Sequence, residues 1–162
     1  MRVAFAAVLV LAAVVAVSPA PASGPRACYG GDLSARAGLQ GAGGAMEGGV
    51  TVRNRSTHTC VLSGRPNVDF LNGDTPLRPN VLPGPSTTGV RRTRALRLRP
   101  GAKAFVHLRW SNWCGPRSPR VGVRLWLMSV KPRLPVSGTT GMPRCDNRER
   151  PSVVAVGPWE HR

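Results

Sequence analysis

The sequence predicts an all-β fold, an immunoglobulin-like β-sandwich of seven to eight short strands with two disulfides; a closed β-barrel is the alternative. Three observations support this prediction. Apolar and polar residues alternate with a period of two in several stretches, and turn signals such as Asn72-Gly73 and Pro100-Gly101 separate them. Beyond the N-terminal segment, no stretch has the apolar periodicity of a helix. Four cysteines complete the pattern.

The first 22 residues have the three parts of a secretory signal peptide. Met1-Arg2 gives a positive start, Val3 to Val17 is apolar, and Ala20-Pro21-Ala22 is a small-residue cleavage motif. The apolar run is shorter than the roughly 20 residues that span a bilayer, which disfavours a membrane anchor. We expect residues 1–22 to be cleaved, leaving one secreted, extracytoplasmic domain over residues 23–162, with its core at about 28–156 and no membrane span.

The four cysteines, Cys28, Cys60, Cys114 and Cys145, all follow this segment. An even number in an exported chain predicts two disulfides. Of the three pairings that four cysteines allow, we favour Cys28–Cys60 and Cys114–Cys145. Each then closes a loop of roughly 30 residues, which stabilises by about 3–4 kcal/mol in the loop-entropy account. No two cysteines have the C-x-x-C spacing of a structural zinc site.

The N-terminal half predicts three or four strands. Residues 23–46 are rich in glycine, so they predict an extended lead-in tied down at Cys28, with a loop over Gly41 to Gly49. Val50 to Pro66 predicts a hairpin of two strands, Gly49 to Arg53 and Thr59 to Ser63, around a polar turn. A third strand, Asn67 to Leu71, precedes the Asn72-Gly73 turn. Leu77 to Leu82 predicts a short edge strand, since Pro79 removes a ladder donor.

The C-terminal half contains the longest alternations. Pro83 to Arg94 predicts a loop, and Leu96 to Trp110 predicts a strand on each side of Pro100-Gly101. In the second of these, Ala104, Val106, Leu108 and Trp110 share the inward face. Arg120 to Val130 alternates again, with Val121, Val123, Leu125 and Leu127 inward. Pro132 to Pro143 predicts a loop with a short strand at most, and Ser152 to Val156 predicts the last strand.

This order of motifs resembles a known family. Cys28 is followed by Asp32-Leu33 and a glycine-rich gap, then by the strand VTVRN and the block Thr59 to Pro66, TCVLSGRP. An L-x-PG-x-x-A turn at Leu98 to Ala104, a tryptophan in the next strand and two further cysteines follow. The pattern is similar to the exported actinobacterial family called domain of unknown function 4232. It departs at Arg65, where that family usually has an aromatic residue. The resemblance implies an extracytoplasmic domain and carries no catalytic or binding residues.

The charge favours an anionic partner. The chain has 23 basic and 7 acidic residues, a net charge of +16, and all the basic residues except Lys103 and Lys131 are arginine. This excess is consistent with binding to an anionic cell-envelope polymer or an acidic exported protein, and equally with codon bias in a GC-rich gene. Nucleic acid is disfavoured, because no nucleic-acid-binding motif is present and aromatic residues that could stack on bases are scarce.

The candidate binding residues lie on two strands and one loop. If the strands at 102–110 and 120–130 pair, their outward side chains form one cationic and aromatic face; these are Phe105, His107, Arg109, Arg124, Trp126 and Met128. Arg and Trp are enriched where interfaces bind most strongly. The loop adds an arginine arm for polyanions, formed by Arg91, Arg92 and Arg94.

The sequence favours a non-enzymatic binding or structural module without a cofactor. Its carboxylates are scattered, and no serine has a nucleophile-elbow context, so we expect no enzyme. One alternative is an extracytoplasmic copper-type binding protein that uses His58, His107, Met46, Met128 and Met142, although no two of these have motif spacing. A second alternative is a secreted enzyme inhibitor that presents the stapled loop Asn112 to Pro119. The triplet Asn54-Arg55-Ser56 also fits a glycosylation sequon.

Overall fold

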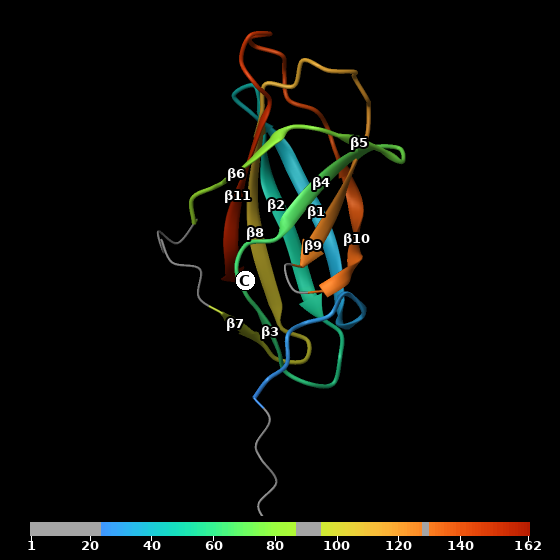
Figure 1. Ribbon diagram of the computed structural model, residues 1–162, viewed down its shortest axis with the longest axis vertical. Coiled ribbons are helices and arrows are strands. Elements are labelled where there is room, and N and C mark those ends of the chain that lie inside the picture. The colour runs from blue at the N-terminus through green and yellow to red at the C-terminus, as the bar shows by residue number, and fades with distance from the viewer. Residues whose placement is uncertain (1–23, 87–94, 128–129) are drawn as a thin grey trace, which may run out of the picture.

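The computed structural model describes residues 24–86, 95–127 and 130–162. The predicted signal peptide, the arginine arm and Met128 therefore lie outside the described residues. The described chain forms β-strands and one short 3-10 helix (Figure 1). Their bounds are η1 Gly30–Asp32, β1 Leu33–Ala42, β2 Ala45–Asn54, β3 Cys60–Leu62, β4 Asn67–Asn72, β5 Thr75–Leu77, β6 Asn80–Pro83, β7 Leu96–Leu98, β8 Lys103–Ser111, β9 Val121–Leu127, β10 Val130–Thr140 and β11 Val153–His161.

Nine of these strands form one mixed sheet, in the order β5-β4-β9-β10-β1-β2-β8-β11-β6. The pairs β1/β10 and β6/β11 are parallel, and the other neighbours are antiparallel. The remaining two strands, β3 and β7, pair antiparallel as a separate ribbon. The all-β prediction is thus confirmed.

The main sheet curls into a half-barrel around its core. Strands β4 and β8 are separated by four strands in the sheet order. Nevertheless the rings of Phe70 on β4 and Trp110 on β8 lie 4.5 Å apart between centroids. In Figure 1, β4 and β9 accordingly lie in front of β1, β2 and β8. We call β4 and β9 one limb of the sheet, and β1, β2 and β8 the other limb. The inner faces of the two limbs bury one continuous apolar core.

This arrangement differs in detail from the expected sandwich. An immunoglobulin-like sandwich of seven to eight strands divides its strands between two sheets. Here one hydrogen-bonded sheet supplies both layers, because it bends sharply enough to pack against itself. A closed barrel is not formed either, since β5 and β6 end the strand order without pairing with each other.

The alternation on the two longest predicted strands is confirmed. Ala104, Val106, Leu108 and Trp110 of β8 are fully buried. Val121, Val123, Leu125 and Leu127 of β9 are buried too, at no more than 7% exposure. A period of two places alternate side chains on opposite faces of a strand, so both strands contribute every second residue to the core.

The expected lead-in and loop are instead a long hairpin. Strands β1 and β2 pair from Leu33/Asn54 to Ala42/Ala45 around a turn at Gly43-Gly44, where φ is 55° and 86°. Local propensity argued against strands here, because glycine weakens an isolated strand. Pairing on both sides overrides it, since β1 also pairs with β10 and β2 with β8.

The hairpin predicted over Val50 to Pro66 was wrong. Its two strands lie in different sheets, because β2 pairs with β1 and β8 while β3 pairs with β7. The strands flanking Pro100-Gly101 are separated in the same way, although the turn itself forms, with Gly101 at φ 76°. The Cys28–Cys60 bond and the Cys28 N–H to Val61 O hydrogen bond tie β3 to the N-terminal segment instead.

Three further strands differ from their predictions. The single edge strand expected over Leu77 to Leu82 is two strands, β5 and β6, which end opposite edges of the main sheet. The expected loop Pro132 to Pro143 contains most of β10, which its neighbours β1 and β9 hold extended. Strand β11 runs five residues past Val156, to His161, because β8 continues to pair with it.

Two disulfides cross-link the chain at the two ends of the fold. Cys28 is bonded to Cys60, and Cys114 to Cys145, which is the pairing favoured above. The first bond joins the N-terminal segment to the β3/β7 ribbon and is buried, with both cysteines at 2% exposure or less. The second joins the β8–β9 loop to the segment before β11, and both of its cysteines are exposed.

Candidate functional site

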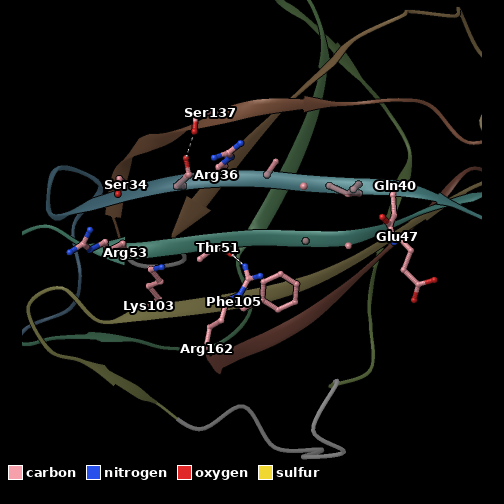
Figure 2. A pocket seen from close by; sticks show the side chains of 16 residues that line it. Ser34, Arg36, Gln40, Glu47, Thr51, Arg53, Lys103, Phe105, Ser137 and Arg162 are labelled. Carbon is pink, nitrogen blue, oxygen red and sulfur yellow. Dashed lines mark hydrogen bonds between the residues drawn. The ribbon is translucent and has the colours of Figure 1, made fainter.

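A groove runs over the outer face of β1, β2 and β8 (Figure 2). Its volume is about 900 Å³. The outward residues of these three strands form it, together with Ser137 of β10 and Arg162 at the C-terminus. In an antiparallel sheet, outward residues of neighbouring strands line up in rows. Here the register sets Arg36 opposite Thr51 and Thr51 opposite Phe105.

Three glycines leave part of the groove floor without side chains. Gly38 of β1 pairs with Gly49 of β2, and Gly48 directly precedes Gly49 on β2. A Cβ on Gly49 would lie 2.0 Å from the carbonyl oxygen of Val106 and 2.6 Å from the ring of Phe105. A Cβ on Gly48 would lie 2.1 Å from the carbonyl oxygen of Gly38. Glycine is thus required at 48 and 49, whereas a Cβ on Gly38 would meet nothing within 4 Å and would project into open space.

The residues that line the groove are predominantly cationic. Four basic side chains, Arg36, Arg53, Lys103 and Arg162, are exposed along it, against a single carboxylate, Glu47. In Figure 2, Arg53 and Glu47 lie at opposite ends. None of the four cations forms an ion pair with a carboxylate in the described part of the chain. The groove therefore carries an excess of positive charge concentrated toward one end.

Two of the cations are positioned by neighbouring groups. The Arg53 Nε donates a hydrogen bond to the carbonyl oxygen of Gly101 at 3.2 Å. Arg162 donates to the Thr51 hydroxyl, and its guanidinium lies 5.4 Å from the centroid of the Phe105 ring. Phe105 is thus enclosed between the Gly49 backbone and a cation, an arrangement that the quadrupole of the ring favours.

Glu47 is held at the other end by two side chains of β8. Its Oε1 lies 3.3 Å from His107 Nε2, and its Oε2 lies 3.4 Å from the Arg109 guanidinium. His107 and Arg109 were predicted as binding residues. The structure pairs them with this carboxylate, which reduces their availability to an anionic ligand.

The predicted cationic and aromatic face is not assembled. It required β8 and β9 to pair, but β10, β1 and β2 separate these strands in the sheet. Arg124 and Trp126 therefore lie on the other limb from Phe105, His107 and Arg109. There Trp126 Nε1 donates to Asp69 Oδ2 at 2.6 Å, across the β4/β9 pair. Of the five predicted residues that the structure describes, only Phe105 lines the groove.

The two histidines proposed as copper-type ligands lie in different contacts, and Met128 lies outside the described residues. His58 contacts Arg26 and Asp32, and His107 contacts Glu47. Met46 is buried in the core, and the sulfur of Met142 accepts a hydrogen bond from the Ser118 N–H at 3.1 Å. Among the described residues, no group of three or more His, Cys, Asp or Glu side chains could hold a metal ion.

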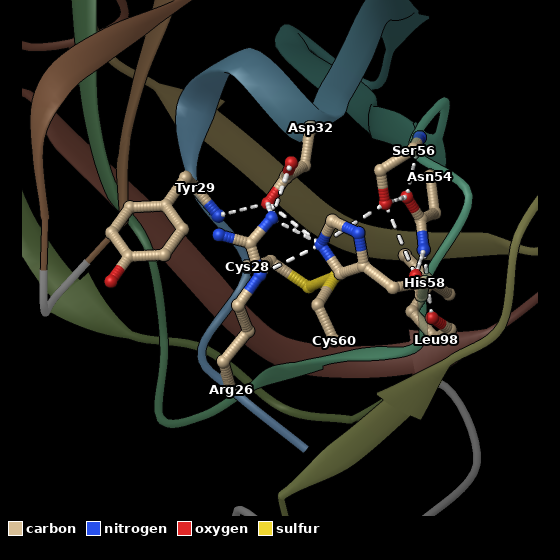
Figure 3. A network of polar contacts seen from close by, with 9 residues as sticks. All are labelled: Arg26, Cys28, Tyr29, Asp32, Asn54, Ser56, His58, Cys60 and Leu98. Carbon is tan, nitrogen blue, oxygen red and sulfur yellow. Dashed lines mark hydrogen bonds and ion pairs between the residues drawn. A yellow bond between two sulfur atoms is a disulfide. The ribbon is translucent and has the colours of Figure 1, made fainter.

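A polar network around His58 contains Ser, His and Asp side chains (Figure 3). The Ser56 hydroxyl lies 3.4 Å from His58 Nε2, and an Asp32 oxygen lies 3.7 Å from the same nitrogen. Arg26 Nε also donates to that nitrogen, at 2.7 Å. A catalytic relay needs the carboxylate and the hydroxyl on different ring nitrogens. This geometry instead fastens the N-terminal segment to the loop after β2, beside the Cys28–Cys60 disulfide.

The stapled loop Asn112 to Pro119 is organised by its first residue. Asn112 is buried at φ 56°, and its Nδ2 donates to the carbonyl oxygens of Asn147 and Arg150 at 2.8 and 2.6 Å. Its Oδ1 accepts from the N–H groups of Asp146 and Asn147. Trp113 is buried and donates to the Pro116 carbonyl oxygen at 2.9 Å. Residues 114–117 are exposed at the tip.

Sequence reasoning missed most of the groove. Its β1 residues fell in the expected lead-in, so their outward row, Ser34, Arg36, Gly38 and Gln40, was not recognised. A usable signal was present, because Leu33, Ala35 and Ala37 alternate with that row as small or apolar inward residues. Arg162 could not be found, since only the β8/β11 register brings the C-terminus to Phe105.

The all-β fold carries two disulfides. Because disulfides persist in oxidising environments, these features are typical of a domain of an extracytoplasmic compartment. In the described residues no helix is long and apolar enough to cross a membrane. Over residues 28–160 the chain matches the family described as "Domain of unknown function (DUF4232)", and it belongs to that family. Neither the search of curated proteins nor that of solved structures gave a match.

Proposed function

We propose that this protein is a secreted, non-enzymatic binding module of the cell envelope that holds an anionic partner in the groove over β1, β2 and β8. The observation that carries the proposal is the set of four exposed cations, Arg36, Arg53, Lys103 and Arg162, around a glycine floor. Folded monomers normally intersperse charges of both signs. A groove with one carboxylate and four cations creates a local positive potential that attracts an anionic ligand.

The scaffold suits this role, because the groove lies on the outside of paired strands. Interior strands of a sheet are rigid and hold their side chains at fixed spacing. We also propose that the curled sheet acts as an immunoglobulin-like scaffold. Its two limbs pack face to face across one core, as the layers of a sandwich do.

A second candidate function, enzyme inhibition, is favoured by one observation. Asn112, the Cys114–Cys145 disulfide and the Trp113 hydrogen bond to Pro116 hold the first part of the loop at 112–119. The Ser118 N–H, which donates to the Met142 sulfur, holds its second part. A preorganised loop loses little entropy on docking to an enzyme. The copper-type alternative has no comparable observation in its favour.

The experiment is a pull-down of the oxidised protein on cell-envelope fractions at roughly 0.05 and 0.5 M salt, since higher salt shortens the Debye length and weakens exposed ion pairs. The test variant reverses three groove charges (Arg36→Glu, Arg53→Glu and Lys103→Glu). The matched control reverses three exposed arginines outside the groove (Arg78→Glu, Arg97→Glu and Arg120→Glu).

We expect retention of the parent protein at low salt and a loss of about tenfold or more in the groove variant, given up to about 1 kcal/mol for each exposed charge contact. The control variant should lose clearly less. Equal losses in the two variants would show that only net charge matters and would reject the groove as the site. No retention of the parent protein at either salt would reject envelope binding altogether.

A further inference from the structure

We infer that the occupant of the groove is a linear acidic polysaccharide that lies along β1, with its anionic groups at the Arg53 end. The inference rests on the proposed function, because it assigns a chemical class to the ligand of the same groove. Four features of the groove carry it: its length, the pairing of its floor strands, the lack of exposed apolar anchors, and the uneven distribution of charge.

The groove is long enough for an extended polymer. It follows β1 from Ser34 to Gln40 and β2 from Glu47 to Arg53. At about 3.4 Å per residue, each of these stretches spans about 20 Å. A single small anion would occupy a small part of such a groove. Several units of an extended chain can contact it together, and their individually weak contacts add up.

The backbone of the floor is already paired over most of its length, which disfavours a peptide. Strand β1 pairs with β10 and β2, strand β2 with β1 and β8, and strand β8 with β2 and β11. Peptides that bind to sheets usually add a strand at a free edge and gain main-chain hydrogen bonds. Along the groove β2 and β8 are paired on both sides, and the unpaired edge among the described residues is the β10 side of β1 beyond Arg36. That edge is only a few residues long, so a ligand of the groove binds mainly through side chains and through close approach to the glycine floor.

Exposed apolar anchors are scarce in the groove. Protein interfaces depend on buried aromatic and apolar hot spots, and single-stranded nucleic acids depend on stacking against open rings. Phe105 is the one aromatic residue among the lining residues, and it is half-buried between Gly49 and Arg162. The other large apolar lining residue, Leu39, packs against the core, and Ala35 and Ala37 are buried in it. The remaining lining residues carry charged groups, hydroxyls, an amide or bare backbone. Such a surface matches the hydroxyls and anionic substituents of an acidic glycan.

The charge distribution orients the ligand. Arginine guanidinium groups bind carboxylate or phosphate groups in a bidentate manner, and Arg36, Arg53 and Arg162 supply three of them. At the other end, Gln40 and Glu47 offer oxygens that accept hydrogen bonds from sugar hydroxyls. Glu47 would repel an anion there. The preferred glycan therefore bears its charge at intervals, with hydroxyl-rich units between the charged ones.

The test fills the groove without altering its cations. Gly38→Glu places a side chain into open space on the floor and adds one negative charge. Gly41→Glu is the matched control, because Gly41 lies on the same strand, its Cβ also meets nothing within 4 Å, and it does not line the groove. Thermal unfolding of both variants should match that of the parent protein, so that any loss of binding is local.

The probes are polygalacturonate, a phosphodiester-bearing glycan, neutral dextran, poly-L-glutamate and single-stranded DNA, each titrated by calorimetry at the same salt. We expect at least one acidic glycan to bind at least tenfold more tightly than poly-L-glutamate and DNA, while dextran does not bind. The two acidic glycans distinguish a carboxylate ligand from a phosphate ligand.

Gly38→Glu should abolish glycan binding, and Gly41→Glu should preserve it. Glu47→Gln should strengthen binding to the most densely charged probe.

The outcomes separate this inference from the proposed function. Equal affinity for acidic glycans, poly-L-glutamate and DNA would overturn the glycan assignment and leave a general polyanion groove. Tighter binding of poly-L-glutamate or DNA would assign the groove to an acidic protein or a nucleic acid instead. Loss of glycan binding in Gly41→Glu as well would overturn the placement along β1. If no polyanion bound while the protein still bound cell envelopes, both the groove and the glycan would be rejected.

Discussion

Asn54 joins three segments of the chain at the end of β2. Its side chain is fully buried, and its Nδ2 donates to the carbonyl oxygens of His58 and Leu98 at 2.8 and 2.9 Å. Its Oδ1 accepts from the N–H and the hydroxyl of Ser56. The amide therefore turns the chain out of the main sheet toward β3 and ties it to β7. It is committed inside the fold, so the sequon at Asn54 cannot carry a glycan in the folded protein.

We predict that Asn54→Ala lowers the free energy of unfolding by about 2–4 kcal/mol, because it leaves buried carbonyl and N–H groups without their partner. Urea unfolding followed by tryptophan fluorescence measures this loss. Asn80→Ala, at an exposed position on β6, is the control and should change stability by no more than about 0.5 kcal/mol. Similar stabilities for the two variants would show that the bonds of Asn54 contribute little.

The two disulfides close loops of similar length but join elements with different solvent exposure. Both close loops of similar length, with sequence separations of 32 and 31 residues. Each is therefore worth about 4 kcal/mol in the chain-entropy account. Their surroundings are unlike each other, since Cys28 and Cys60 are buried in the core, whereas Cys114 and Cys145 lie in exposed loops. Access of a thiolate to the sulfur is one factor that controls exchange rates.

We predict that mild dithiothreitol treatment of the native protein reduces Cys114–Cys145 first and leaves Cys28–Cys60 intact. Alkylation of free thiols followed by peptide mass mapping identifies which pair has opened. In urea, where burial is lost, the two pairs should be reduced at similar rates. Preferential reduction of Cys28–Cys60 in the native protein would contradict the assigned burial.

At the scale of the whole molecule, the curl of the sheet is held by contacts between limbs that are distant in the strand order. Phe70 and Trp110 are both fully buried at this junction, and Trp113 packs against Trp110 with ring centroids 5.6 Å apart. The indole Nε1 of Trp110 donates to the Ser152 hydroxyl at 2.9 Å, which links β8 to the start of β11. The half-barrel thus depends on a small aromatic cluster.

We predict that Phe70→Ala lowers the free energy of unfolding by about 3–5 kcal/mol, the range for removing a buried phenylalanine from a core. It should also weaken the near-UV circular dichroism of the packed tryptophans. Urea titration and spectroscopy at 25 °C provide the two measurements. Phe105→Ala is the control, because that ring lies half-buried on the outer face of β8. A loss for Phe70→Ala no greater than for Phe105→Ala would contradict the junction.

Sequence reasoning predicted the strands that carry a clear alternation. The inward rows of β8 and β9 were assigned residue by residue, because a buried face leaves an apolar residue at every second position. Strands β1 and β10 were missed, because prolines interrupt the pattern on β10, and glycines and small alanines make the alternation on β1 weak. They are extended because neighbouring strands pair with them, which is a tertiary effect.

The candidate site, like the fold, could be predicted only in part from the sequence. The net charge of +16 predicted an anionic partner but could not place it. Phe105 was named correctly as outward-facing, yet its predicted neighbours Arg124 and Trp126 lie on the other limb. The cations that line the groove with it come from three strands and the C-terminus; they are Arg36, Arg53, Lys103 and Arg162.

The all-β class, the turns at Asn72-Gly73 and Pro100-Gly101, and the inward faces of the longest strands could be predicted from the sequence, because these depend on local periodicity and local backbone preference. Which strands pair, how the sheet curls and where the cations gather became visible in the folded structure. Those features depend on contacts between residues far apart in the chain. Alternation specifies which face of a strand is buried, but not which strand lies beside it.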